Sequence, residues 1–191
     1  MRIQYSLHLL ILLLLVSVAC FAEPLIQHHP NGKVSVTGTL DDNGLPHGIV
    51  QRYSKEETLL SERTYHHGVL QGISKLYYPT GELMTEWNYK NGKRDGISLG
   101  YYQNGKLKDQ GVYREDQLHG TVQMYAGDGA LKAEMNFKND RQDGATKTFA
   151  EDGTLEFIYT YRKGQLINRK EFDSLGKLVR EQDYPVRQVL P

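Results

Sequence analysis

The chain has 191 residues, with 23 basic and 23 acidic side chains, so its formal net charge is zero. A balanced charge gives no electrostatic reason to expect a nucleic-acid partner, because nucleic-acid-binding proteins carry a basic excess or stripe. Gly and Tyr are abundant, with 19 and 13 copies, which favours short strands joined by tight turns.

The first residues are typical of a targeting segment rather than of a folded domain. Arg2 is followed by an unbroken apolar run from Leu9 to Val16, which is shorter than the roughly 20 apolar residues of a transmembrane helix. Two cleavage products are predicted: a signal peptide of residues 1–22 is removed, or residues 1–19 are removed and Cys20 is lipidated. We expect an exported protein, periplasmic or secreted, or alternatively a membrane-anchored lipoprotein; a retained anchor is the third alternative.

Cys20 is the only cysteine, so the folded part has none to pair after either cleavage. Disulfides, a cysteine nucleophile, an iron–sulfur cluster and a cysteine-rich zinc site are therefore excluded from the mature chain.

A repeat of 24 residues dominates the rest of the chain. Written in rows of 24 that start at Gly48, the sequence aligns glycine at the first position, an aromatic at the sixth and a second aromatic at the eighteenth. Because the aromatic columns are twelve residues apart, each row is predicted to be a β-hairpin. The three columns are Gly48, Gly72, Gly96, Gly120 and Gly144; Tyr53, Tyr77, Tyr101, Tyr125 and Phe149; and Tyr65, Tyr89, Tyr113, Phe137 and Tyr161.

Local patterns agree with strands and tight turns. Alternate residues such as Leu83, Thr85 and Trp87 form an apolar stripe of period 2. The tenth column is glycine apart from Glu57, and it includes Asn-Gly and Asp-Gly pairs, which suit the positive φ angles of hairpin turns. No helical stripe is found in the mature chain, although a short helix near its C-terminal end stays open.

The pattern predicts an all-β fold, an elongated antiparallel sheet of successive hairpins preceded by the signal peptide. Residues 23–43 are predicted to be an N-terminal lead with a partial repeat, residues 44–184 the repeat array, and residues 185–191 a tail. The glycine and aromatic columns are interpreted as structural, because the apolar stripe of each hairpin is covered by the next hairpin. The same holds for a leucine column at the twelfth position: Leu59, Leu83, Leu107, Leu131 and Leu155.

Rows such as GISKLYYPTGELMTEWNYKNGKRD resemble the bacterial variant MORN repeat. The matching elements are the row-opening glycine, the Tyr77-Tyr78 and Tyr101-Tyr102 pairs, and Tyr-Lys-Asn-Gly-Lys. The resemblance implies an elongated, twisted sheet of hairpins. It also implies a scaffold or lipid-contacting role, and bacterial proteins of this kind are often labelled antitoxin-like.

Few residues are left for chemistry. His28-His29 and His66-His67 could touch a metal, but neighbours on a strand point to opposite faces, so each pair should offer at most one ligand per face. His47 and His119 fall in a column that otherwise holds Gln71, Asp95 and Asp143, which we interpret as a polar turn position. No metal site and no cofactor is expected.

A column of Glu62, Glu86 and Glu134 is predicted to form cross-strand charge pairs, facing a basic column of Lys90, Arg114, Lys138 and Arg162. General acid–base catalysis needs two unequal environments, whereas equivalent repeat positions supply equal ones. No catalytic residue is therefore expected, and the chain is predicted not to be an enzyme.

The expected function is a non-enzymatic interaction or scaffold module of the cell envelope, with a protein partner of unknown identity. Tyr78, Trp87 and Tyr102 are the predicted contact residues, since Tyr and Trp are favoured at interfaces. Two alternatives stay open: an immunity or antitoxin-like protein that neutralises a toxin in the periplasm, and a lipid-surface binder. Membrane contact is expected only through the lipid anchor or a weak surface contact.

Overall fold

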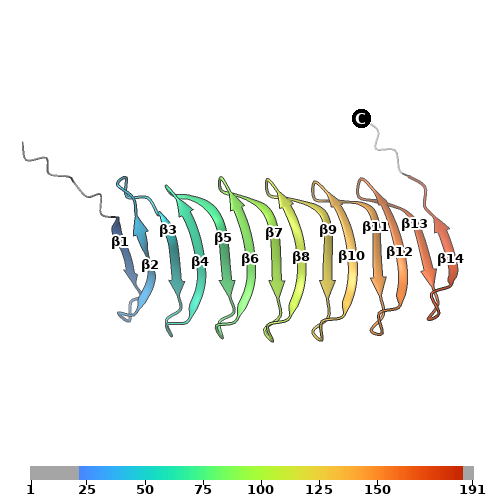
Figure 1. The fold of residues 1–191 in the computed structure, drawn as a ribbon, viewed down its shortest axis with the longest axis horizontal. Helices are drawn as coiled ribbons and strands as arrows, with labels where there is room; N and C mark the ends of the chain where they lie inside the picture. The colour runs from blue at the N-terminus through green and yellow to red at the C-terminus, as the bar shows by residue number, and fades with distance from the viewer. Residues whose placement is uncertain (1–21, 187–191) are drawn as a thin grey trace, which may run out of the picture.

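The computed structural model describes residues 22–186, which form one open β-sheet (Figure 1). Fourteen strands lie in chain order, and each is hydrogen-bonded antiparallel to the next. The strands are β1 (Glu23–His28), β2 (Val34–Leu40), β3 (Gly48–Tyr53), β4 (Leu59–His66), β5 (Val69–Tyr77), β6 (Leu83–Lys90), β7 (Lys93–Tyr101), β8 (Leu107–Arg114), β9 (Gln117–Tyr125), β10 (Leu131–Lys138), β11 (Arg141–Phe149), β12 (Leu155–Arg162), β13 (Gln165–Phe172) and β14 (Leu178–Asp183).

The predicted all-β sheet of successive hairpins is confirmed. Each row from Gly48 onward forms one hairpin, with β3 and β4 as the first of them. The N-terminal lead forms a complete hairpin of its own from β1 and β2. The described residues contain no helix, and the C-terminal segment forms β14 instead. The predicted signal peptide lies outside the described residues apart from Ala22, as does Cys20.

Four of the row-opening glycines, Gly72, Gly96, Gly120 and Gly144, lie at bulges in the sheet. Opposite Gly96 the register between β6 and β7 shifts between Trp87 and Tyr89, so β7 contributes extra residues there. Gly96 has a φ of +119°, and a Cβ at this position would lie 3.1 Å from the Cβ of Asn88. Both the backbone angle and the close approach require glycine. A bulge increases the local twist of a sheet, and this one recurs every 24 residues from Gly72 to Gly144.

The best-buried side chains are small. Ser74 is 3% exposed and Ser98 is 9% exposed, and the two lie on either side of Trp87, each in register with it. Among the described residues no large side chain is fully buried, and the aromatic columns are half-buried. A single sheet has no second layer to cover it, so small side chains are buried by larger neighbours on adjacent strands.

Glu57, the one residue other than glycine in the tenth column of the repeat, offers a test of turn strain. Glu57 has a φ of +68° in the β3–β4 turn, where later rows have glycine. A left-handed conformation costs a non-glycine residue about 1–2 kcal/mol, and glycine's extra chain entropy returns part of this. Glu57→Gly should therefore raise the free energy of unfolding by about 0.5–1 kcal/mol, measured by urea denaturation.

Glu56→Gly is the matched control, because Glu56 lies next to Glu57 and is also exposed but does not have a positive φ. The ion pair of Glu57 with Lys33, at 3.1 Å between exposed side chains, contributes little. Equal destabilisation by both substitutions would show that the turn at Glu57 is not strained.

Candidate binding surface

The two faces of the sheet differ in character. In β5 and β6 the pair Ser74–Trp87 alternates with the pair Lys75–Glu86, and successive pairs point to opposite faces. We call the side of Ser74 and Trp87 the core face, and the side of Lys75 and Glu86 the ladder face. Neither face is covered by another element of the described chain (Figure 1).

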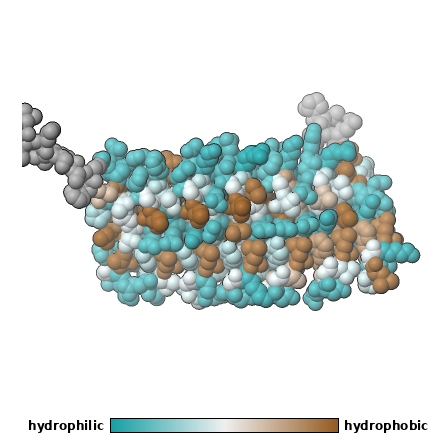
Figure 2. Space-filling view, in the orientation of Figure 1, coloured by the Kyte–Doolittle hydropathy of each residue, from teal (hydrophilic) through white to brown (hydrophobic). Residues whose placement is uncertain are grey.

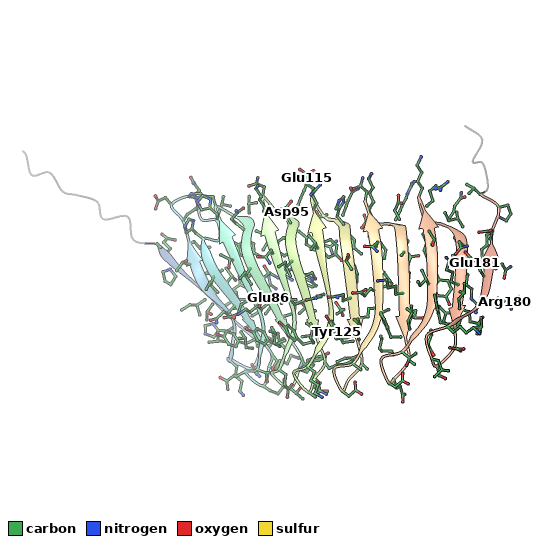
Figure 3. All side chains as sticks on the ribbon, turned by 45° about the vertical axis from the view of Figure 1, so that its right-hand side comes forward. Glu86, Asp95, Glu115, Tyr125, Arg180 and Glu181 are labelled. Carbon is green, nitrogen blue, oxygen red and sulfur yellow. The ribbon has the colours of Figure 1, made fainter. Side chains whose placement is uncertain are left out.

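A row of polar side chains crosses the middle of the ladder face. Gln51 Nε2 donates to Glu62 Oε2 at 2.8 Å, and Tyr77 donates its hydroxyl proton to Glu62 Oε1 at 2.7 Å. The same arrangement recurs where Gln123 Nε2 donates to Glu134 Oε1 at 2.9 Å. Figure 3 shows Glu86 and Tyr125 lying within the sheet, between its two edges. Hydrogen bonds thus link successive strands sideways, independently of the backbone.

The predicted charge pairing is confirmed for one glutamate, but the predicted basic column is wrong. Glu134 Oε2 lies 3.6 Å from Lys147 Nζ, and Glu62 and Glu86 are in register with Lys75. Lys90 instead pairs in register with Lys93 at the edge of the sheet. Lys90 and Arg114 are the last residues of β6 and β8, whereas Glu86 lies four residues earlier in the middle of β6, so the acidic and basic columns do not face each other.

The hydrogen bond between Tyr77 and Glu62 shifts both titrations. Burial raises the pKa of Tyr77 to about 12, and the Glu62 carboxylate adds to this. The hydroxyl of Tyr77 lowers the pKa of Glu62, with the Gln51 amide as the second cause. The pair is a structural one, in which a neutral phenol stabilises a carboxylate.

Three exposed isoleucines also lie on the ladder face, one in each of the first three rows of the repeat. Ile49, Ile73 and Ile97 are 56%, 44% and 55% exposed. Each is two strands from the next, which corresponds to about 10 Å. Shallow hollows flank them; one is lined by Ile49, Ile73 and the polar side chains of Glu62, Thr64 and Lys75. Figure 2 shows apolar groups in rows across the strands, separated by a polar band.

The predicted contact residues are not gathered on this surface. Tyr78 donates its hydroxyl to the Tyr101 carbonyl at 2.8 Å, and Tyr102 donates to the Tyr125 carbonyl at 2.7 Å. These bonds join each hairpin to the next. Trp87 is half-buried on the core face. Their part in partner binding stays a prediction. The isoleucine column was visible in the sequence as the second position of the first three rows, but nothing marked it as exposed.

The expectation that a histidine pair offers one ligand per face is wrong for His66-His67. The two rings lie 4.5 Å apart between centroids. His66 ends β4, but His67 lies in the turn with a φ of +48°, so strand alternation no longer applies. His47 lies beside both rings, with centroids 5.2 and 4.9 Å away.

The hairpins match a known repeat family. Residues 70–91, 94–115, 118–139 and 142–163 each match the model of the MORN repeat variant. The chain contains four tandem MORN repeats. MORN repeats are in general non-catalytic modules that bind proteins or membrane lipids. No curated protein matches the chain. The hairpins outside residues 70–163 extend the same sheet in both directions.

The described part of the chain has no helix of the length and hydrophobicity needed to cross a bilayer.

The Tyr77–Glu62 pair makes stability depend on alkaline pH. The folded state keeps the Tyr77 proton up to a pKa of about 12, whereas an unfolded tyrosine loses it near 10. The stabilisation is therefore complete below pH 10 and is lost as the pH rises toward 12. Tyr77→Phe should show a shallower loss of stability over this interval, measured by denaturant unfolding at each pH.

Glu62→Gln is the companion variant. It removes the carboxylate that helps to raise the pKa of Tyr77, so it should also reduce the alkaline slope. It should further reduce the loss of stability below pH 4.5, because the lowered pKa of Glu62 contributes stability only above its ordinary value. An unchanged alkaline slope in both variants would contradict the role of this pair.

Proposed function

We propose that this MORN-repeat protein is a non-enzymatic protein-interaction module of the cell envelope, which binds its partner on the ladder face. The observation that carries the proposal is the row of Ile49, Ile73 and Ile97. Exposed apolar side chains in a contiguous row, bordered by polar groups, are typical of interaction surfaces. The envelope location is inferred from the N-terminal segment.

The form of the surface favours an elongated partner. The isoleucines repeat at about 10 Å intervals across the strands, since two strand spacings separate them. The polar row of Gln51, Glu62 and Lys75 runs parallel to them. A partner segment lying across the strands would meet an apolar row and a hydrogen-bonding row side by side. The polar row would set its register, and the apolar row would supply most of the buried area.

The carboxylates on this face support a binding role rather than catalysis. Glu62 accepts hydrogen bonds from Gln51 and Tyr77, and Glu134, three repeats further along the chain, accepts the equivalent bond from Gln123. The hydrogen bonds from Tyr77 and Gln51 lower the pKa of Glu62 and so favour its ionised form. A general acid would need a carboxyl in a distinct environment that raises its pKa.

The surface can be tested with a double substitution on the isoleucine row. Full-length chain carrying Ile73→Glu and Ile97→Glu should lose its captured envelope protein at least ten-fold compared with the wild type, because two buried apolar contacts become charged. The measurement is affinity capture from envelope extract with quantification of the retained protein, followed by titration of that protein.

Val179→Glu is the matched control, because Val179 is 56% exposed but lies on β14 at the far end of the sheet. It should leave capture unchanged. Equal capture by the double variant would exclude the isoleucine row as the binding surface. If the chain captured no protein and instead sedimented with anionic vesicles, the lipid-surface alternative would replace the proposal. A captured toxin that the chain inactivates would identify the immunity role.

A further inference from the structure

Three histidines meet at the strand ends on the side of the sheet that holds the β2–β3 and β4–β5 connections. His66 ends β4, His67 lies in the β4–β5 turn, and His47 directly precedes β3. One ring nitrogen of each lies within 4.8 Å of those of the other two. The rings of His66 and His67 are exposed, and that of His47 is half-buried.

The repeat frame explains why these residues meet. The column of His47 regularly reaches the turn that lies twenty residues further along the chain: Gln71 Oε1 accepts from the Asn91 amide at 2.9 Å. Asp95 does the same for the Glu115 amide at 3.3 Å, and Figure 3 shows both of these residues at one edge of the sheet. The equivalent contact one row earlier joins positions 47 and 67, and both of these positions are histidine.

A carboxylate orients one of the three rings. Asp41 Oδ2 lies 2.5 Å from His67 Nδ1, and Asp41 is itself fixed by the backbone amides of Asn43 and Leu45. Its side chain is 9% exposed. A hydrogen bond from Nδ1–H to a carboxylate holds the imidazole in the tautomer whose Nε2 is free to bind a metal, as carboxylates do behind histidine ligands in metal sites.

We propose that His47, His66 and His67 bind one divalent transition-metal ion, with Zn²⁺ as the ion that the donor set fits best and with Asp41 as the positioning residue. Imidazole nitrogens suit Zn²⁺, Cu²⁺ and Ni²⁺, and three histidines with an open fourth position form a known zinc arrangement. Zn–N bonds of 2.0–2.1 Å place tetrahedral ligands about 3.3 Å apart. The three ring nitrogens lie within 4.8 Å of one another, and rotation of the exposed His66 and His67 side chains would bring them to this shorter distance.

His119 provides the internal comparison. It occupies the same column as His47, and both have a buried Nδ1 without a hydrogen-bond partner. The unpartnered nitrogen therefore belongs to the column and does not by itself indicate a metal. The turn opposite His119 carries Lys138 and Asn139 in place of the two histidines. Only the first of the two positions can supply three imidazoles.

The test is a Zn²⁺ titration of the full chain, prepared without a polyhistidine tag and freed of metal with a chelator, by isothermal titration calorimetry. The wild type should bind one ion per chain. His47→Gln, His66→Lys and His67→Asn each install the residue of the next row (Gln71, Lys90 and Asn91), so the fold and the positive φ at position 67 are retained. Each should weaken binding at least ten-fold, and the triple variant should lose the site.

His119→Gln is the matched control and should bind Zn²⁺ like the wild type. Zn²⁺ should also raise the melting temperature of the wild type and of this control but not of the triple variant, because an ion that binds the folded state stabilises it. Wild-type affinity in the triple variant, as would follow if His28 and His29 were the ligands, would overturn the proposal. An equal loss in His119→Gln would do the same.

Asp41→Asn tests the positioning role separately. It keeps the oxygen that caps the turn but removes the charge, so Zn²⁺ should bind about ten-fold more weakly, as is usual for such partners of metal ligands. The independent readout is the ¹⁵N chemical shift of the His67 ring in the metal-free chain, which should move away from the Nδ1–H tautomer. Unchanged affinity together with an unchanged tautomer would remove Asp41 from the site.

Discussion

The structure depends on pairing between neighbouring strands, because a single open sheet has no second layer against which to bury apolar surface. Large side chains stay half-buried, and the best-covered residues are small ones such as Ser74, flanked by Trp87. Backbone ladders and side-chain bonds that cross from strand to strand therefore carry much of the stability. Each hairpin is marginal alone and is stabilised by its two neighbours.

This constraint also determines the ends of the array. β1 and β14 each leave one edge unpaired within the described chain, and an open edge can pair with other chains. β1 contains Pro24, which has no backbone N–H to donate, and β14 carries Arg180 and Glu181 on an exposed strand (Figure 3). Proline and charge limit such pairing. The end hairpins depart from the repeat because they have a neighbour on one side only.

The architecture could be predicted from the sequence because its signals are periodic. Glycines at bulges and aromatics at fixed intervals identify the hairpins and their order. The faces could not be assigned in the same way. Alternation shows that Ser74 and Lys75 point in opposite directions, but it does not show which of the two sides is better buried, and the isoleucine row was not recognised as exposed. The acidic and basic columns do not face each other because Glu86 lies in the middle of β6 and Lys90 at its end, beside the turn to β7.

The histidine cluster escaped prediction for a different reason. The argument from strand alternation applies within a strand, and His67 lies one residue beyond the end of β4 in a left-handed turn. The relation between His47 and His67 was nevertheless present in the repeat frame, since the column of Gln71 and Asp95 contacts the turn twenty residues further on.

A repeat protein separates structure from function by position. Residues that recur in every row are explained by the register that all rows share, as for the glycine at each bulge. Residues that a few rows carry and the others lack have no such explanation: isoleucine is replaced by Thr121 and Ala145 in the later rows, and Asp41 stands where the following rows have an aromatic. These departures cluster in space, on one face and at one edge of the sheet. Under the proposed function, binding specificity resides in the residues that distinguish the rows, while the shared columns hold those residues in register.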